Sequence, residues 1–206
     1  MKTLKAQYIA DVQSLSDEAL RTALADLEPH AIDNVNWNEF PYAPSVTFRI
    51  AYSEKAIALM FEVNEAHVKA TALENNGPVW EDSCVEFFFQ PDNADGRYLS
   101  FEINPLGTLL IGLGHGIPDI VYLPDDRSQF NIETYREDHY WQVCYQIPES
   151  FMKQFFKELS PQIRGNFMKC ADDSAKPHHG CWSNIIMPHP AYHVPQFFGH
   201  IVLEQE

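Results

Sequence analysis

The stretch V-T-F-R-I-A-Y-S-E-K-A-I-A-L-M-F-E-V, residues 46–63, decides the fold class of this chain. Val46 to Tyr52 alternates apolar and mixed positions, and Ala56 to Val63 continues in the same way after the short connection Ser53 to Lys55. Apolar residues at every second position are typical of a strand with one buried face. This stretch therefore predicts an antiparallel β-hairpin.

Further strand-like segments follow the hairpin at short intervals. The turns between them are rich in Pro, Gly, Asn and Asp, as in Pro91 to Arg97. Long helices do not alternate with these segments, which disfavours a parallel α/β sheet. The sequence predicts an all-β fold, a two-sheet antiparallel β-sandwich with a few short helices. We expect its strands at 46–52, 56–63, 85–90, 98–104, 108–113, 141–147, 163–170 and 199–204.

Two short helices are expected beside these strands. Between Ser14 and Leu27 the apolar residues fall near helical spacing, and Ser16 is the candidate N-cap. Ser150 to Leu159 is amphipathic, because its three phenylalanines and Leu159 fall on one helical face.

Length and composition favour a globular chain. The 206 residues include 45% hydrophobic and 13% aromatic residues, enough to bury a sizeable core. We therefore expect residues 1–206 to form a single domain. No apolar run approaches the ~20 residues that a membrane-spanning helix needs.

The charge balance bears on the partners of the protein. The chain has 14 Lys and Arg against 29 Asp and Glu, a net charge of −15. Such a surface repels phosphate backbones and anionic lipids, so we expect no nucleic acid and no membrane partner. The N-terminal M-K-T-L-K-A-Q-Y-I-A lacks the apolar region of a signal peptide. This predicts a cytoplasmic protein unless a leader has been removed, and no pattern indicates an oligomeric state.

The cysteines do not form a zinc ribbon, because none of them makes a C-x-x-C pair. Cys84 and Cys144 lie in strand-like runs and are expected to behave as small buried hydrophobes. Cys170 and Cys181 could form a disulfide in an oxidising compartment, and the sequence leaves that open.

The Pro- and His-rich stretch 176–195, K-P-H-H-G-C-W-S-N-I-I-M-P-H-P-A-Y-H-V-P, is too irregular for a strand and too aromatic for a solvent loop. We expect binding residues in it. Its histidines, His178, His179, His189 and His193, lack metalloprotease spacing, so packing roles are favoured and no metal site is expected. The turn P-D-N-A-D-G offers oxygen ligands, which makes a structural calcium possible, although a polar turn is favoured. No other cofactor is expected.

The stretch V-W-E-D-S-C-V-E-F-F-F-Q-P-D, residues 79–92, carries the candidate site. Trp80 precedes a predicted strand and Glu86 lies inside it. An aromatic ring beside a fixed carboxylate suits a sugar, which offers one face to the ring and hydroxyl groups to the carboxylate. A core tryptophan with an unrelated glutamate is the alternative. Glu102 lies on the next predicted strand. Because only one turn separates the two strands, Glu102 could face Glu86 across the strand pair.

Four motifs resemble family 9 carbohydrate-binding modules and, more narrowly, the family-9-like proteins of the DOMON superfamily. They are W-E-D-S-C-V-E-F-F, Y-L-S-F-E-I-N-P-L-G-T-L-L, R-G-N-F-M-K-C and H-V-P-Q-F-F-G-H-I-V-L, in this order between residues 37 and 203. The resemblance implies a two-sheet sandwich in which two tryptophans hold a sugar at a chain end. Trp80 and Trp182 match the two tryptophans, Glu86 the strand glutamate, and Asn104 an asparagine of the site.

One position departs from the family pattern. Glu102 stands where the sugar-binding members carry an arginine, so an acceptor replaces a donor. Arg164 or Lys169 could supply the positive charge, and their odd spacing lets only one of them reach the site. We favour Lys169, as a bridge that keeps Glu86 and Glu102 ionised. The segment His115 to Arg127 has no counterpart in the family.

The first expectation is non-catalytic carbohydrate binding linked to polysaccharide degradation, with no catalytic residues. The alternative is a glycoside hydrolase that acts on O-glycosyl bonds through Glu86 and Glu102. A second alternative, implied by the DOMON likeness, is haem binding by Met168 and a loop histidine. The predicted ligand-binding residues are Trp80, Glu86, Glu102, Asn104, Lys169 and Trp182.

Overall fold

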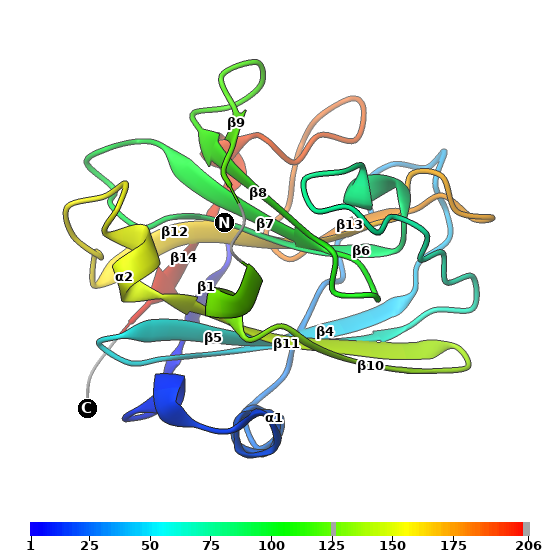
Figure 1. Cartoon of the computed structure of the whole chain (residues 1–206). Coiled ribbons are helices and arrows are strands. Elements are labelled where there is room, and N and C mark those ends of the chain that lie inside the picture. The colour runs from blue at the N-terminus through cyan, green and yellow to red at the C-terminus, as the bar shows by residue number, and fades with distance from the viewer. Residues whose placement is uncertain (125–126, 204–206) are drawn as a thin grey trace.

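The protein is a sandwich of two mixed β-sheets with a few short helices, described here by a computed structural model for residues 1–124 and 127–203 (Figure 1). The larger sheet has the order β1-β14-β12-β6-β7-β8-β9, with β13 paired to β12. Its strands are β1 (Thr3–Lys5), β6 (Cys84–Gln90), β7 (Tyr98–Ile103), β8 (Leu109–Gly114), β9 (Val121–Tyr122), β12 (Gln162–Cys170), β13 (His179–Cys181) and β14 (Gly199–Val202).

The smaller sheet lies below the larger one in Figure 1 and has the order β10-β11-β5-β4-β2, with β3 paired to β4. Its strands are β2 (Gln7–Tyr8), β3 (His30–Ala31), β4 (Ser45–Tyr52), β5 (Ala56–Asn64), β10 (Glu133–Glu137) and β11 (Tyr140–Pro148). The predicted hairpin is confirmed as β4 and β5, which pair antiparallel.

The predicted sandwich is confirmed, but the prediction that it is wholly antiparallel is wrong at two edges. β1 pairs parallel with β14, and β2 pairs parallel with β4. Residues 3–5 thus extend one edge of the larger sheet, and residues 7–8 extend one edge of the smaller sheet. Strands of two or three residues carry too little periodicity to be recognised from sequence.

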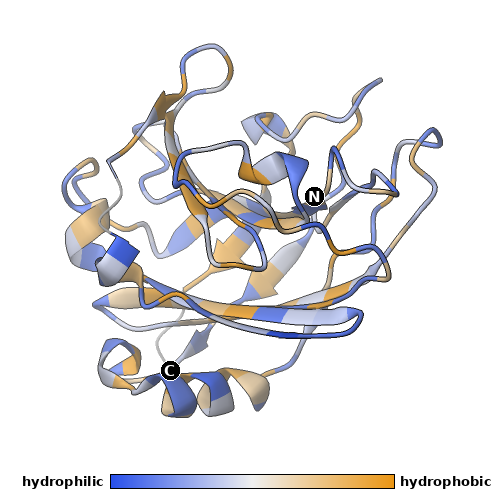
Figure 2. Ribbon diagram, turned by 45° about the vertical axis from the view of Figure 1, so that its right-hand side comes forward, coloured by the Kyte–Doolittle hydropathy of each residue, from blue (hydrophilic) through white to orange (hydrophobic). Residues whose placement is uncertain are grey.

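The main core lies between the sheets and is built from the inward side chains of both. Phe48 of β4 stacks on Phe167 of β12 with ring centroids 3.6 Å apart, and Phe167 stacks in turn on Phe87 of β6 at 4.6 Å. Hydrophobic residues concentrate in the strands of both sheets (Figure 2). Alternation along each strand therefore decides which side chains enter this core and which point away from it.

The helices are short and cover the edges of the sandwich. Helix α1 (Asp17–Ala25) begins after Ser16, whose hydroxyl accepts the backbone N–H of Ala19, so the predicted cap is confirmed. Leu20 and Leu24 of α1 pack against the outer face of the smaller sheet. Helix α2 (Glu149–Met152) has four residues, so the predicted helix to Leu159 is wrong beyond Met152. The other helical turns are η1 (Val12–Ser14), η2 (Val79–Glu81), η3 (Arg127–Phe130) and η4 (Pro195–Phe197).

Among the described residues, no helix is long and apolar enough to cross a membrane. Several elements also differ from their predicted form. Every residue of β10 is exposed, so this strand shows no apolar alternation that would reveal it. β13 lies inside the stretch that was expected to be irregular. The last strand ends at Val202, and the predicted end at Glu204 lies outside the described residues.

All four cysteines are buried and free. Cys170 and Cys181 lie on paired strands but are not opposite each other, because Cys181 pairs with Met168 and Cys170 pairs with His179. The register of β12 and β13 therefore does not favour the disulfide that the sequence left open.

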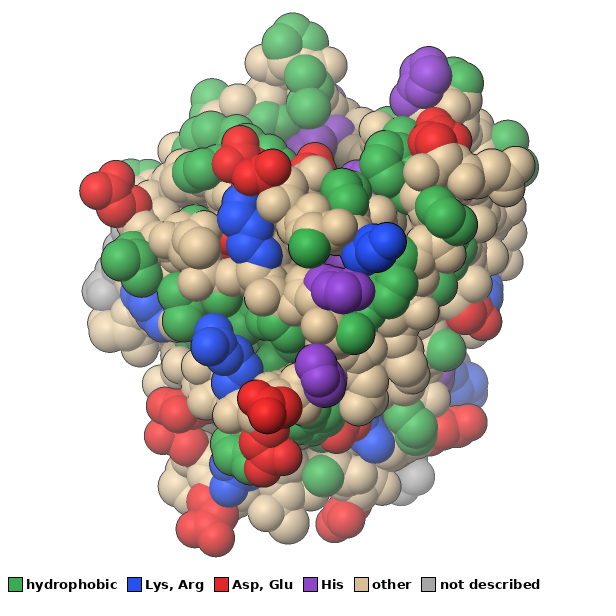
Figure 3. All heavy atoms as spheres, turned by 90° about the vertical axis from the view of Figure 1, so that its right-hand side faces the viewer, with side chains coloured by type: hydrophobic (Ala, Val, Ile, Leu, Met, Phe, Trp, Pro, Cys, Tyr) green, Lys and Arg blue, Asp and Glu red, His purple; other side chains and the backbone are tan. Residues whose placement is uncertain are grey.

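The side chains of the larger sheet that do not enter the core point to its outer face. Loops from three regions of the chain cover it: the turn η2, the segment 115–123 and the segment 186–194. On the face of the molecule shown in Figure 3, acidic, basic and histidine side chains are interspersed rather than sorted into patches of one sign.

Candidate functional site

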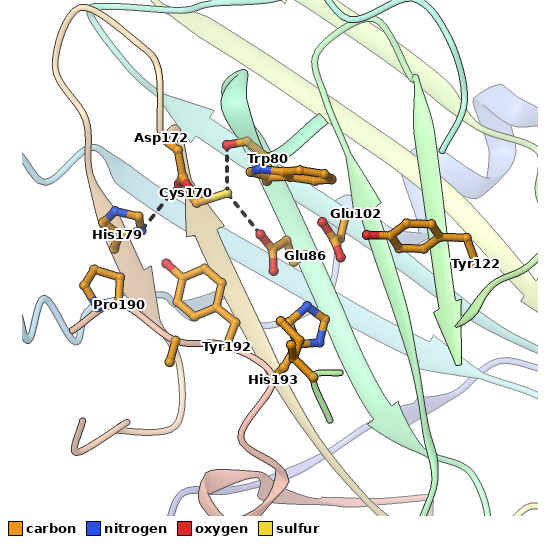
Figure 4. Close-up of a pocket in the computed structure, with 12 residues that line it drawn as sticks. Trp80, Glu86, Glu102, Tyr122, Cys170, Asp172, His179, Pro190, Tyr192 and His193 are labelled. Atoms are coloured by element: carbon orange, nitrogen blue, oxygen red, sulfur yellow. Dashed lines mark hydrogen bonds and ion pairs between the residues drawn. The ribbon is translucent and has the colours of Figure 1, made fainter. Parts of the chain in front are cut away.

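A cavity of about 510 Å³ opens between the outer face of the larger sheet and these loops (Figure 4). Its floor carries Glu86 of β6, Glu102 of β7 and Cys170 of β12. The covering segments add aromatic, apolar and ionisable side chains. These are Trp80, Ile117, Tyr122, Asp172, His179, Pro190, Ala191, Tyr192 and His193. The volume lies within the range typical of small-molecule sites.

Trp80 forms one wall and is held there by its backbone. It lies in η2, immediately before β6, and its side chain is half-buried. Its carbonyl oxygen accepts the backbone N–H of Asp172 at 3.1 Å and lies 3.5 Å from the Cys170 sulfur. The turn before β6 is thus tied to the end of β12, and one face of the indole ring stays available to the cavity (Figure 4).

The two floor glutamates confirm the expected pairing across the ladder. Glu86 and Glu102 are directly opposite each other in the antiparallel pair β6–β7, and both are buried. Burial, the Cys170 thiol and the Glu102 carboxyl raise the pKa of Glu86 well above its usual value. Burial also raises the pKa of Glu102, to about 8. At neutral pH the pair therefore retains protons, which limits the repulsion between the two carboxyls.

The cysteine thiols beside the two glutamates also have raised pKa values. Burial raises the pKa of Cys84 to about 11, and burial together with the Cys84 thiol raises the pKa of Cys170 well above its usual value. Cys170 Sγ donates a hydrogen bond to Glu86 Oε1 at 3.0 Å. The floor is thus a group of buried acids that keep their protons when no cation is near.

The cavity rim carries two neutral histidines and an aspartate whose pKa is raised. Burial and the Glu81 carboxylate raise the pKa of Asp172 to about 6. Burial lowers the pKa of His179 and of His193 to about 4, so both rings are neutral at pH 7. The contact of 3.7 Å between His179 Nδ1 and Asp172 Oδ1 is therefore polar rather than an ion pair. Tyr98 donates to the neutral His193 Nδ1 at 2.7 Å.

The prediction that Asn104 contacts a ligand does not match its place in the structure. Asn104 is fully buried, and its Nδ2 donates to Ala72 O and to Asp82 Oδ2. Its Oδ1 accepts the backbone N–H groups of Leu106 and Thr108. All these bonds are made within the protein, so Asn104 fixes the loop that leads into η2 and positions Trp80 indirectly.

The predicted bridge from Lys169 to the two glutamates is wrong. Lys169 points into the space between the sheets, where its Nζ pairs with Glu65 Oε2 at 3.2 Å and donates to His178 Nε2 at 2.8 Å. Burial, followed by the Lys169 charge, lowers the pKa of His178 to about 3, so this ring is neutral. Because Glu86 faces the other side of the sheet, Lys169 cannot hold it ionised.

Trp182 does not form a second wall of this cavity. It is 3% exposed and packs edge-on against Phe48 and Phe167 in the core between the sheets. A Cβ added at Gly199 would lie only 2.4 Å from its ring, which shows how closely the backbone of β14 approaches it. The structure therefore does not bring Trp80 and Trp182 together over one ligand.

The remaining sequence candidates have packing or turn roles. Arg164 lies outside the cavity lining and donates to Pro195 O at 2.8 Å. Met168 is buried with Trp37 and Phe88 in a small cluster. His189 lies 4.0 Å from Glu39 on the surface. In the turn P-D-N-A-D-G, Asp92 accepts the backbone N–H of Ala94, and Asp95 pairs with Arg97.

Several cavity residues were not predicted individually. Ile117 and Tyr122 lie in the part of the chain without a family counterpart, and residues 115–123 of it cover the outer face of the sheet. Five lining residues lie in the Pro- and His-rich stretch, from which Trp182 was predicted to bind the ligand and His179 and His193 were expected to have packing roles. Its aromatic content was the signal that could have found Tyr192.

Residues 16–203 match the family model for carbohydrate-binding family 9. The crystal structure of a proposed carbohydrate-binding protein from Bacteroides uniformis is 34% identical and superposes with a TM-score of 0.88, covering 98% of this chain and 99% of that one. No curated protein matches this chain.

Two solved structures of family 9 modules from Caldicellulosiruptor kristjanssonii share the fold. The one in complex with glucose is 15% identical with a TM-score of 0.66, covering 100% of this chain and 97% of that one. The one in complex with cellotriose is 14% identical with a TM-score of 0.69, covering 100% and 95%. The narrower DOMON likeness stays a prediction. Because the family model spans most of the sequence and the B. uniformis protein is 34% identical over nearly its whole length, this chain belongs to carbohydrate-binding family 9.

Proposed function

We propose that this protein binds a carbohydrate in the cavity without cleaving it, with one sugar face on Trp80 and the hydroxyl groups directed to Glu86 and Glu102. The observation that carries this proposal is the half-buried indole of Trp80 above a buried pair of carboxyl groups. An aromatic ring covers the apolar face of a pyranose, while carboxyl groups bond its hydroxyls. Relatives that bind glucose and cellotriose add support.

The protonation of Glu102 supports the same proposal. A carboxyl group with a pKa of about 8 is mostly protonated at neutral pH and can then donate one hydrogen bond as well as accept others. This restores a donor at the position where the sugar-binding members are expected to carry an arginine. A hydroxyl group, which both donates and accepts, matches such a site better than a fixed anion would.

Tyr122 offers a second aromatic surface. In Figure 4 its ring lies beyond Glu102, at the opposite end of the floor from Cys170, with its hydroxyl directed toward Glu102. Its side chain is largely exposed. We propose that a sugar spans the floor between Trp80 and Tyr122, so that Tyr122 takes the role that the sequence assigned to Trp182.

A second candidate function, glycoside hydrolysis, is favoured by one specific observation. Glu86 and Glu102 are directly opposite each other on neighbouring strands, and their pKa values are raised. Retaining glycosidases use two close carboxyls, one of them protonated. The Lys169 bridge that would have kept both groups ionised is not formed, so this candidate stays open to test.

The binding experiment is calorimetric titration of the protein with glucose and cellotriose, followed by a panel of other oligosaccharides. Trp80→Ala should weaken affinity for the sugar that binds by about 5-fold, because a lost stacking contact costs ~1 kcal/mol. Tyr135→Ala is the matched control, an exposed aromatic of β10 outside the cavity, and should bind normally. Unchanged affinity in Trp80→Ala would contradict the site.

The same sugars should be recovered intact after long incubation, as measured by the release of reducing ends. Reducing-end release that disappears in Glu86→Gln would replace the binding proposal with the hydrolase. Failure of every carbohydrate in the panel to bind would contradict both candidates.

A further inference from the structure

Cys84, Glu86 and Cys170 form a compact group of potential metal ligands at the cavity floor. Cys84 and Cys170 are directly opposite each other in the antiparallel pair β6–β12, and Glu86 follows two residues after Cys84 on the same face of β6. The sulfur atoms and a carboxylate oxygen all lie within 4.8 Å of one another, and all three side chains are buried.

We propose that these three side chains bind one thiophilic divalent cation of the zinc class, through both Sγ atoms and a Glu86 carboxylate oxygen. Two cysteine sulfurs with one harder ligand are a donor set that zinc accepts in proteins. Zinc bonds of about 2.0–2.3 Å imply ligand atoms roughly 3.5–4 Å apart in a tetrahedral site. Cys170 Sγ and Glu86 Oε1 are 3.0 Å apart and would separate slightly, and the other ligand atoms, all within 4.8 Å, would close by no more than about 1.3 Å to reach that geometry.

The ligands come from rigid elements, and their surroundings favour a cation. All three lie on central strands of the larger sheet, where the backbone is held by neighbours on both sides. The cavity adds the carboxyl groups of Glu102 and Asp172. Among the described residues that line it, none is a lysine or an arginine. A divalent ion would therefore enter a cavity with acidic neighbours, while the nearby charge of Lys169 lies on the other face of the sheet and is paired with Glu65.

The proposed ion has an open fourth position. Glu86 and Cys170 line the cavity, whereas Cys84 is fully buried behind them. Three protein ligands on the floor leave the remaining tetrahedral position directed into the cavity, where water or a ligand oxygen can occupy it. The site shares Glu86 with the proposed carbohydrate site, but ion binding does not depend on sugar binding and is tested without any sugar.

The test uses the full chain, reduced and stripped with a chelator, and titrates it with Co²⁺ and then Zn²⁺. We expect one equivalent of Co²⁺ to bind with thiolate-to-metal charge-transfer absorption and the strong visible bands of a tetrahedral site, and Zn²⁺ to displace it. Cys84→Ser and Cys170→Ser should each lose the charge-transfer bands seen in the wild type, or retain only a weaker one-sulfur signal. Glu86→Gln should weaken Co²⁺ affinity by at least the ~10-fold that even outer-shell changes cost.

Cys144→Ser and Cys181→Ser are the matched controls, since these cysteines are also buried and free but lie outside the group. Both should bind Co²⁺ as the wild type does. Circular dichroism checks the folding of each variant. If neither serine variant folds, X-ray absorption at the zinc edge of the wild-type protein reports its ligands directly.

Three outcomes would overturn the proposal. These are folded, reduced protein that shows no thiolate charge transfer with Co²⁺, undiminished bands in both Cys84→Ser and Cys170→Ser, or a zinc environment without sulfur. A Cys84–Cys170 disulfide that persists after reduction would also overturn it, because neither sulfur could then bind the ion as a thiolate.

Discussion

Glu86 and Glu102 are carboxyl groups in a buried environment, which disfavours their charged form. A buried carboxylate is costly unless it is paired, and the two glutamates avoid that cost by keeping protons at neutral pH. The protons make the pair useful to a sugar, because a protonated carboxyl donates and accepts hydrogen bonds. The raised pKa values also make the free energy of unfolding depend on pH, which can be measured.

Glu102→Gln should flatten this pH dependence. The pKa of Glu102 rises from 4.5 to about 8 on folding, so its contribution to stability is fully present below pH 4.5 and is lost as the pH rises through about 8. In that window the slope is at most about 1.4 kcal/mol per pH unit for this group. Glutamine resembles the protonated acid and has no such slope. Urea unfolding at several pH values compares the two proteins, and parallel profiles would contradict the raised pKa.

Strand β12 directs a charged side chain to one face of the larger sheet and sulfur-containing side chains to the other. Lys169 points inward to Glu65, while Met168 and Cys170 on either side point outward. Glu65 also accepts hydrogen bonds from Ser83 and Trp141, so this buried ion pair belongs to a satisfied network. Removing one partner of such a pair leaves a buried charge without compensation.

Lys169→Met should therefore lower the free energy of unfolding by about 3–5 kcal/mol, through the unpaired Glu65 rather than through the cavity. Lys153→Met is the matched control, because the Lys153–Glu149 pair is exposed and should contribute less than about 1 kcal/mol. Denaturant titration gives both values. Adding Glu65→Gln to Lys169→Met should recover part of the loss, and a Lys169→Met protein as stable as wild type would contradict the buried pair.

At the scale of the whole molecule, the larger sheet separates two tryptophans with different functions. Trp182 fills the core between the sheets, and Trp80 lies on the outer face under the loops. The core depends on tight contact, since Trp182 packs against the backbone of β14 at Gly199. The cavity depends instead on an indole face that stays uncovered.

Trp182→Ala should cost about 3–5 kcal/mol of stability, as expected for a large aromatic removed from a packed core. Trp80→Ala should cost clearly less, because its side chain is only half-buried. Thermal and denaturant unfolding of the two variants makes the comparison. Equal losses would contradict the placement of the two tryptophans on opposite sides of the sheet.

Local sequence patterns were enough to predict the fold class and to place Glu86 beside Glu102. Alternation of apolar residues revealed the long strands, because one buried face imposes a period of two. A single turn separates the strands of Glu86 and Glu102, so their pairing could be inferred as well. The short edge strands were missed, since two or three residues show no period.

Local patterns could not predict which face of the sheet each candidate side chain occupies or which loops cover it. The odd spacing of Arg164 and Lys169 correctly places them on opposite faces, but the spacing does not say which face is the cavity. Lys169 points inward, where it meets Glu65, a residue more than a hundred positions earlier in the chain that directly follows strand β5 of the opposite sheet. Trp182 enters the core and Tyr122 reaches the cavity for the same physical reason: the stacking of the sheets and the path of the loops depend on contacts between distant residues, which no local pattern encodes.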